Sequence, residues 1–305
     1  MSIPAEQNVS HETIRGRMDG KCVVITGATS GIGRATALAL ARLGARLLFV
    51  SRDRATGHAL ARRLTTTTAR CEFIEADLSS LVQVRTAAKQ IRERCLTIDV
   101  LINNAGARFD TYASTPEGFE RTFATNHLGH FLLTGLLLDR LAAAPSARII
   151  TVSSSAAAHA RLDELWQFQA HDFDRKQAYA KSKLANLTFA FELARRLSGT
   201  AITSLAVDPG VVATRFARNN GLLAWFKHLI YHGRRRELIS SGQGADTLIY
   251  LASAPSLPIN APGMYFRERQ PIRACPTAYD AAAATQLWAL SVALSGQDPA
   301  LKRGN

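Results

Sequence analysis

The feature that most constrains the fold is a short apolar run that leads directly into a glycine-rich loop. The run covers Lys21–Ile25, and the loop that follows, residues 26–33, reads TGATSGIG. Beyond it, Ala35–Leu43 carries apolar side chains at helical spacing, and Gly44 ends the predicted helix. A strand, a glycine turn and a helix in this order are typical of the first unit of a doubly wound α/β sheet.

The glycines of this loop fit the binding of a dinucleotide. Gly27 allows a tight turn, Gly31 lets the backbone approach a pyrophosphate, and Gly33 lets the helix pack against the strand. The N–H groups and the positive end of the helix then face the phosphates. The spacing is GxxxGxG, and three glycines alone would also fit an ordinary strand–helix turn. With the flanking elements, we expect Gly27, Ser30, Gly31, Ile32 and Gly33 to contact the cofactor.

The end of the next predicted strand, Ala45–Val50, indicates which nicotinamide cofactor is used. In dinucleotide folds an acidic residue here selects NAD, and an arginine can hold the 2′-phosphate of NADP. Ser51 stands where the acid would be, and Arg52 follows with a guanidinium that suits a phosphate. Asp53 lies two residues past the strand and can cap a helix that begins near Arg54. The pattern favours NADP(H) over NAD(H), although Arg52 also fits a solvated surface arginine.

Two further strand ends carry candidate cofactor contacts. Asp77 and Leu78 follow the predicted strand Cys71–Glu75, and Asp77 could accept a hydrogen bond from the adenine amino group. Equally, Asp77 or Ser79 could cap the next helix. The predicted strand Ile98–Ile102 ends in the motif NNAG. Three of its residues, Asn104, Ala105 and Gly106, lie at the carboxyl edge of the sheet, where ligands of such folds bind. NNAG alone could also be a turn.

The candidate catalytic residues follow a fifth predicted strand, Arg148–Val152, which ends in three serines. Tyr179 and Lys183 lie four residues apart and so share one face of a helix. A nearby ammonium group lowers the pKa of a tyrosine from its usual value of about 10 and brings it closer to the range of efficient acid–base catalysis. An isolated Tyr-x-x-x-Lys is usually a surface pair. Beside the glycine loop and the serines, it predicts proton transfer.

Together, TGxxxGIG, NNAG and YxxxK resemble the short-chain dehydrogenase/reductase family in order and spacing. The resemblance implies that Tyr179 is the acid/base and that Lys183 holds the nicotinamide ribose and lowers the Tyr179 pKa. It also implies that Ser154, or Ser153 or Ser155 if the register is shifted, binds the reacting oxygen, and that Asn126 supports the triad. The segment after the sixth predicted strand, Ala201–Val207, matches the Pro-Gly segment of the family, whose predicted cofactor contacts are Pro209, Gly210, Val212 and Thr214.

Longer motifs resemble the branch that contains retinol dehydrogenases and WW-domain oxidoreductases. They include TNHLGHFLLT around Asn126, AYAKSKLAN and DPGVVAT. One departure is Asp208, where a histidine is common in that branch. The segment over about residues 215–240 resembles a substrate lid. Its Trp225 and Phe226 indicate a lipophilic substrate, but they fit a core or dimer contact nearly as well. A third interpretation makes the segment a basic membrane-surface helix.

Composition sets the remaining expectations. The chain has 305 residues, which one α/β domain can accommodate, and a formal net charge of +13. We predict a flexible arm over 1–19, one Rossmann-type domain with about seven strands over 20–296 and a tail over 297–305. No recognisable nucleic-acid module and no apolar run of membrane length occur. We therefore expect a cytoplasmic protein, monomeric or homo-oligomeric, that acts on a small molecule.

Cysteines and histidines give no metal signal. The four cysteines, Cys22, Cys71, Cys95 and Cys275, lack CxxC spacing, so we expect free thiols and no metal. His127 and His130 flank Asn126 without a metal-ligand pattern.

Two functional hypotheses follow. The first is an NADP(H)-dependent oxidoreductase that interconverts a carbonyl compound and an alcohol. The alternative is a cofactor-binding sensor without turnover, which would not need Ser154, Tyr179 and Lys183 all intact.

Overall fold

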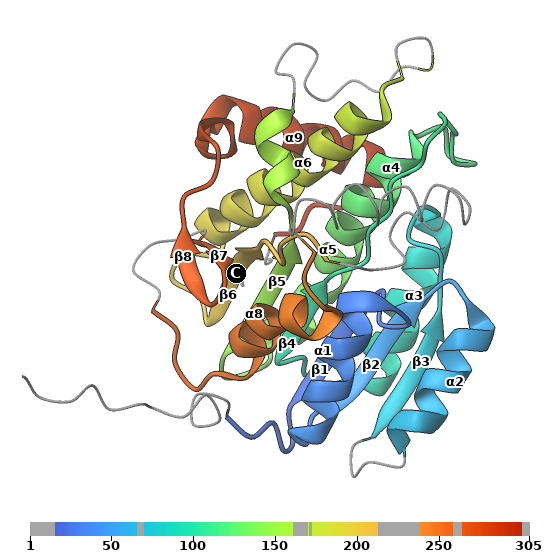
Figure 1. The fold of residues 1–305 in the computed structure, drawn as a ribbon, viewed down its shortest axis with the longest axis vertical. Coiled ribbons are helices and arrows are strands. Elements are labelled where there is room, and N and C mark those ends of the chain that lie inside the picture. Colours follow the sequence, from blue (N-terminus) through green and yellow to red (C-terminus); the bar gives the residue numbers. More distant parts are fainter. Residues whose placement is uncertain are drawn as a thin grey trace, which may run out of the picture.

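One sheet organises the described part of the chain. The computed structural model describes residues 16–65, 70–160, 170, 173–212, 238–258 and 264–300. Within these ranges the strand order is β3-β2-β1-β4-β5-β6-β7-β8 (Figure 1). The strands are β1 Cys22–Thr26, β2 Arg46–Ser51, β3 Cys71–Glu75, β4 Val100–Asn103, β5 Ala147–Val152, β6 Ile202–Val207, β7 Met264–Arg267 and β8 Gln270–Ile272. The strands β1 to β7 pair in parallel, which confirms the predicted doubly wound sheet, and β8 adds an antiparallel edge strand.

Helices cover both faces of this sheet. The α-helices are α1 Gly31–Arg42, α2 Arg54–Thr65, α3 Leu81–Arg94, α4 Arg121–Phe123, α5 Gly129–Ala142, α6 Arg175–Arg196, α8 Ser241–Ser253 and α9 Ala281–Ser295. A π-helical turn, η1 Ala124–Leu128, joins α4 to α5, and two 3₁₀ turns are η2 Ser155–His159 and η4 Pro276–Tyr279. Helices α1, α2 and α8 share one core with the sheet, and α3, α5, α6 and α9 share the other (Figure 1).

The strands are apolar on both sides because each side faces a helical layer. In β1, Val23 and Ile25 belong to the core under α1 and α8, whereas Val24 belongs to the core under α3 and α5. All three are fully buried. A parallel sheet with two covered faces needs continuous apolar runs rather than alternation. This requirement explains why the six strands β1 to β6 could be located from the sequence to within two residues at either end, whereas β7 and β8 were not located.

The strand order reverses at β1, which lies between β2 and β4. In open α/β sheets the ligand site lies at such a switch point, beyond the carboxyl ends of the strands. Asn103, Ser153 and Asp208 stand at or just past the ends of β4, β5 and β6, and all three are buried. Polar side chains therefore converge at this edge of the sheet.

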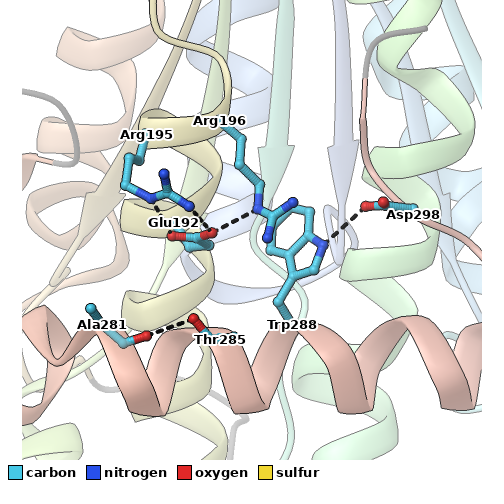
Figure 2. A network of polar contacts seen from close by, with 7 residues as sticks. All are labelled: Glu192, Arg195, Arg196, Ala281, Thr285, Trp288 and Asp298. Carbon is cyan, nitrogen blue, oxygen red and sulfur yellow. Dashed lines mark hydrogen bonds and ion pairs between the residues drawn. The ribbon is translucent and has the colours of Figure 1, made fainter.

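A polar network fastens α9 to α6. Glu192 accepts hydrogen bonds from Arg195 and Arg196, with distances of 2.7–2.8 Å (Figure 2). The Arg196 guanidinium lies 4.0 Å from the centroid of the Trp288 ring, and Trp288 Nε1 donates to Asp298 at 2.9 Å. We call these five residues the α6–α9 clamp. It holds α9 against α6, the helix that carries Tyr179 and Lys183.

Both ends of the described chain pack on the domain. The Gly16 amide donates to Ser253 O, and the Met18 amide donates to Leu43 O. Gln297 lies against α5, where a Cβ at Gly135 would fall 2.8 Å from its Cγ. The limits of the predicted arm and tail stay predictions, because residues 1–15 and 301–305 lie outside the described ranges. Among the helices in those ranges, none is long and apolar enough to cross a membrane.

Candidate active site

The glycine loop can adopt its tight conformation only because its glycines lack side chains. Gly27 has φ +70° and Gly31 has φ +53°. A Cβ on Gly27 would lie 2.8 Å from Ala105 Cα, and one on Gly33 would lie 2.3 Å from Gly27 O. Both glycines are therefore required by close packing of the loop against α1 and the NNAG segment.

The N-terminus of α1 suits an anionic group. Ser30 is the N-cap residue but makes no side-chain capping bond, and the first turn holds no acidic residue. First-turn N–H groups of a helix have no intrahelical acceptor. They are the donors that phosphates use at such sites. The loop and this helix end therefore fit a pyrophosphate.

The NNAG segment braces the loop from the next strand. Asn104 Nδ2 donates to Thr26 O at 2.7 Å and to Gly27 O at 3.3 Å. The backbone amides of Asn104 and Ala105 both donate to Thr26 Oγ1 at 3.0 Å. The Asn104 side-chain amide therefore braces the backbone of the glycine loop, mainly at Thr26.

The end of β2 is arranged as predicted. Ser51 is buried and its hydroxyl lies 3.0 Å from Thr29 Oγ1, while Arg52 is exposed just beyond it. Asp53 Oδ1 accepts from the Thr56 amide at 3.0 Å and caps α2, as the sequence indicated. That hydrogen bond holds the pKa of Asp53 below its usual value. Asp53 therefore has a structural role beside the candidate phosphate contact, Arg52.

Of the two roles left open at the end of β3, the helix cap by Asp77 or Ser79 is wrong. Asp77 Oδ1 accepts from the amide and hydroxyl of Ser79 instead of capping α3. The N-cap residue of α3 is Ser80, and the helix begins at Leu81. The carboxylate of Glu117, which lies in a distant loop, accepts a hydrogen bond from the Leu81 amide at 2.8 Å. The sequence could not show this cap, since Glu117 is 36 positions away. The adenine contact remains the open role for Asp77.

Ser154, Tyr179 and Lys183 lie together at the carboxyl edge. Ser154 follows β5 in extended conformation, and its hydroxyl hydrogen-bonds Tyr179. Its neighbour Ser153 instead donates to Lys183 O at 2.7 Å, which anchors α6 to β5. Of these two serines, Ser154 is therefore the one whose hydroxyl contacts Tyr179.

Lys183 is buried between NNAG and β5. Its Nζ donates to Val152 O at 3.1 Å, and a Cβ on Gly106 would lie 3.3 Å from that Nζ. The Lys183 Nζ also lies 5.7 Å from the centroid of the Tyr179 ring. Desolvation lowers the pKa of Lys183 to about 8, although Asp208 favours its charged form. The structure thus brings together motifs that lie almost 80 positions apart.

The predicted lowering of the Tyr179 pKa is wrong. Desolvation raises the Tyr179 pKa to about 12, with Asp208 adding to it, while the Ser154 hydrogen bond and Arg108 act in the opposite sense. The sequence showed the cation at i+4 but not the burial of the phenol. At neutral pH the phenol is protonated and can donate a proton.

Asn126 occupies a π-helical turn, a feature often found at functional sites. Its side chain accepts from the Ala107 amide at 2.7 Å and donates to Ala107 O and to Ser182 Oγ, each at 2.9 Å. These contacts join η1 to the NNAG segment and to α6. Asn126 therefore connects Ala107 to Ser182 on α6, the helix that also carries Tyr179 and Lys183.

His130 is a residue of this site that the sequence did not reveal. Its Nδ1 lies 2.9 Å from Asn126 O, and its Nε2 lies 2.8 Å from Thr26 Oγ1. Burial lowers the His130 pKa to about 4, so the ring is neutral. A carbonyl only accepts, so Nδ1 carries the proton and the Thr26 hydroxyl donates to Nε2. The only sequence signal was the i, i+4 spacing to Asn126.

The segment after β6 is described only in part. Asp208 is buried, and its Oδ1 accepts from the Gly210 amide at 2.9 Å. Gly210 has φ +78°, and Val212 bridges to Ile239. Thr214 and the lid residues Trp225 and Phe226 lie outside the described residues. Among the described residues, no group of three or more His, Cys, Asp or Glu side chains could hold a metal ion.

Comparison with known proteins identifies the class of protein that this fold and site define. The short chain dehydrogenase family matches residues 21–222, and the chain belongs to that family. It is 40% identical over 298 residues to human retinol dehydrogenase 14, a match that covers 92% of this chain and 88% of the relative. It is 38% identical over 298 residues to a protein of Streptomyces sp. (strain C5) provisionally named daunorubicin C-13 ketoreductase, covering 97% of this chain and 99% of the relative.

Solved structures agree with this assignment. A protein of Mycobacterium paratuberculosis has a TM-score of 0.75 and 36% identity, over 95% of this chain and 98% of that one. A Pseudomonas aeruginosa RhlG/NADP active-site complex has a TM-score of 0.62 and 27% identity, over 77% of this chain and 90% of that one. The chain is thus an oxidoreductase of the short-chain dehydrogenase type, similar to retinol dehydrogenases.

Proposed function

We propose that this protein is an NADP(H)-dependent enzyme that interconverts a ketone or aldehyde and an alcohol, with a lipophilic or polycyclic substrate. The observation that carries the proposal is the placement of Ser154, Tyr179 and Lys183 beside the glycine loop, at one edge of the sheet. A sensor without turnover would need the loop but not a buried lysine beside a tyrosine.

Each side chain has a chemical task in this proposal. When bound, the nicotinamide cofactor supplies or accepts the hydride. The Ser154 hydroxyl binds the reacting oxygen, and Tyr179 Oη donates a proton to it during reduction. The buried Lys183 ammonium binds the nicotinamide ribose and stabilises the phenolate that remains.

The remaining proposed cofactor contacts line the same edge. Asp77 and Leu78 are assigned to the adenine. Asn104, Ala105 and Gly106 adjoin the ribose side, and Pro209, Gly210, Val212 and Thr214 are assigned to the nicotinamide end. Asn126 positions the segment from Ala105 to Ala107 through its two bonds to Ala107.

Selection of NADP(H) is assigned to Arg52. Ser51 leaves no carboxylate to bind the 2′-hydroxyl or to repel a 2′-phosphate, and Arg52 is exposed beside it. The related Pseudomonas aeruginosa structure is a complex with NADP, which supports this choice. The Arg52→Ala variant should bind NADPH at least about tenfold more weakly and NADH unchanged, as expected for one charged hydrogen bond.

Fluorescence titration of both cofactors measures this difference. Arg54→Ala is a matched control, because Arg54 is also exposed, two residues away, and pairs with Glu75 at 3.9 Å. Equal weakening of NADPH and NADH by Arg52→Ala would contradict the phosphate contact.

The substrate class is supported by the relatives named for retinol and for daunorubicin C-13 reduction. Turnover should be followed by NADPH absorbance with a polyene aldehyde, a polycyclic ketone and a small polar ketone. Higher kcat/KM for the two lipophilic compounds is expected, and Trp225→Ala should reduce that preference. A preference for the small polar ketone would overturn the lipophilic assignment, and NADPH binding without any turnover would favour the sensor.

A further inference from the structure

Two of the four cysteines meet at the end of the sheet opposite the candidate active site. Cys22 is the first residue of β1, and Cys95 directly follows α3. Their sulfur atoms are 2.8 Å apart, although the residues are 73 positions apart in the sequence. Both thiols are free, and the spacing of cysteines in the sequence gave no sign of this pair.

The surroundings fix this pair in place. The Cys22 amide donates to Asp99 Oδ2 at 2.9 Å, and Lys21 Nζ donates to the other oxygen of Asp99 at 2.9 Å. The Cys95 amide donates to Ile91 O at 2.8 Å, the last bond of α3. These bonds fix the two backbones from which the sulfurs project, and both side chains are buried.

One sulfur of the pair is the better nucleophile. A hydrogen bond from Cys22 and the nearby guanidinium groups of Arg46 and Arg94 lower the pKa of Cys95, against the effect of burial. Arg46 is the strand partner of Cys22 in β2, and both arginines pair with Glu72. The same hydrogen bond and burial raise the pKa of Cys22. Cys95 is thus the thiol that ionises first, and the thiolate is the reactive form.

We propose that Cys22 and Cys95 form an oxidisable dithiol, a modification site for small peroxides that closes to a disulfide. The Cys95 thiolate attacks hydrogen peroxide, an S–O bond forms and the O–O bond breaks. The leaving hydroxide takes up the proton that Cys95 released, so that Cys95 sulfenic acid and one water form. Cys22 then attacks the sulfenic sulfur, an S–S bond forms and a second water leaves. In total two thiols and one peroxide give one disulfide and two waters. A disulfide has an S–S length of about 2.05 Å, so the sulfurs need only a small further approach.

The chain supplies its own control for this reaction. Cys71 is 8% exposed, comparable with 6% for Cys22 and 2% for Cys95, but it has no sulfur neighbour among the described residues. Burial raises the pKa of Cys71 to about 11. Burial alone therefore cannot distinguish the pair from Cys71, whereas the neighbouring sulfur can.

The experiment treats the reduced full-length protein with hydrogen peroxide, unfolds it with an alkylating agent present and maps the peptides by mass spectrometry. A peptide pair linked through Cys22 and Cys95 is expected, 2 mass units lighter than the dithiol and reversed by dithiothreitol, with Cys71 alkylated. Recovery of alkylated Cys22 and Cys95 at the level of Cys71, or a disulfide with Cys71 or Cys275, would overturn the proposal.

Two further measurements separate the site from the catalytic function. Oxidation should raise the Tm by several degrees, because it closes a long loop, and Cys22→Ser should abolish that rise whereas Cys71→Ser should not. NADPH-dependent turnover should change by less than about twofold, since the cofactor site lies at the other ends of the strands, about five residues or 17 Å away. This proposal stands or falls independently of the proposed enzyme activity.

Discussion

A charged side chain is buried in each half of α6, but these two, Lys183 and Glu192, differ in the partners that surround them. In the first half, Lys183 is 3% exposed and donates to a single main-chain carbonyl, Val152 O. In the second half, Glu192 is 6% exposed and accepts from two arginines of the same helix. The Lys183 pKa is lowered by desolvation to about 8. Burial would raise the Glu192 pKa, but the two arginines outweigh it and the pKa is lowered.

This difference distinguishes a buried charge in the candidate active site from one that only holds two helices together. A buried charge with few partners costs stability and is retained where chemistry uses it. A buried charge with complete partners contributes no chemistry but fixes geometry. The first half of α6 should therefore control turnover with little effect on stability, and the α6–α9 clamp should control stability with little effect on turnover.

The largest expected effect is at Tyr179. Tyr179→Phe removes the proton donor but keeps the ring, so kcat should fall by at least about a hundredfold, with the Tm and the NADPH Kd nearly unchanged. Steady-state kinetics, thermal unfolding and cofactor titration measure the three quantities. Wild-type kcat in the variant would refute the proposed mechanism.

At the clamp, Trp288→Ala should have the converse effect. It removes a buried indole, the cation–π contact with Arg196 and the hydrogen bond to Asp298. We expect a loss of about 3–5 kcal/mol in the free energy of unfolding, as for other buried aromatic side chains. Denaturant unfolding measures this loss, while kcat of the folded fraction should stay within about twofold of wild type.

Thr285→Ala is the matched control for that variant. Thr285 lies on the same helix, is exposed and bonds only Ala281 O within α9 (Figure 2). It should change the free energy of unfolding by less than about 0.5 kcal/mol. A large fall in kcat with Trp288→Ala would show that the clamp and the site are not separate.

The sequence predicted the site better than the clamp, for a physical reason. The glycine loop, NNAG and the Tyr179–Lys183 pair are local patterns, each determined by one strand end or one helix turn. The bonds of Trp288 to Arg196 and Asp298, and of Glu117 to α3, join segments that only tertiary packing brings together. No local pattern encodes such contacts.

The same limit affects the electrostatics. The i+4 spacing of Tyr179 and Lys183 showed a cation beside a phenol, but the burial that dominates both pKa values is a property of the whole fold. His130 illustrates it again, since its role depends on Thr26, 104 positions away. The fold class, the positions of β1 to β6 and the candidate triad could be inferred from the sequence, whereas the balance of charge and burial within the site could not.

Two buried histidines next to Asn126 predict a pH effect of intermediate size. Burial lowers the pKa of His127 to about 3 and of His130 to about 4, both below the unfolded value of 6.5. Below about pH 6.5 the unfolded chain binds protons that the folded chain does not, so stability falls as pH falls. Each histidine should contribute about 1.4 kcal/mol per pH unit until its folded pKa is reached.

Denaturant unfolding of wild type and of His130→Gln at about pH 7 and about pH 5 tests this effect. The variant should lose about 2 kcal/mol less than wild type over that interval, because one of the two titrating groups is gone. His58→Gln, which replaces an exposed histidine, is the control and should match wild type. Equal losses in wild type and His130→Gln would contradict a neutral buried ring.

The smallest expected effect lies where the two regions touch. His127 Nε2 lies 2.9 Å from Ser291 Oγ on α9, and that hydroxyl donates to Leu287 O, so the histidine is the donor. Ser291→Ala should cost about 1 kcal/mol of stability, the value of one hydrogen bond. Turnover should not change, because Asn126 is held independently by Ala107 and Ser182. Ser295→Ala, whose hydroxyl bonds only the following turn, is the control. If Ser291→Ala lowers kcat more than Ser295→Ala at equal stability, α9 positions Asn126 through His127, and the clamp belongs to the catalytic apparatus.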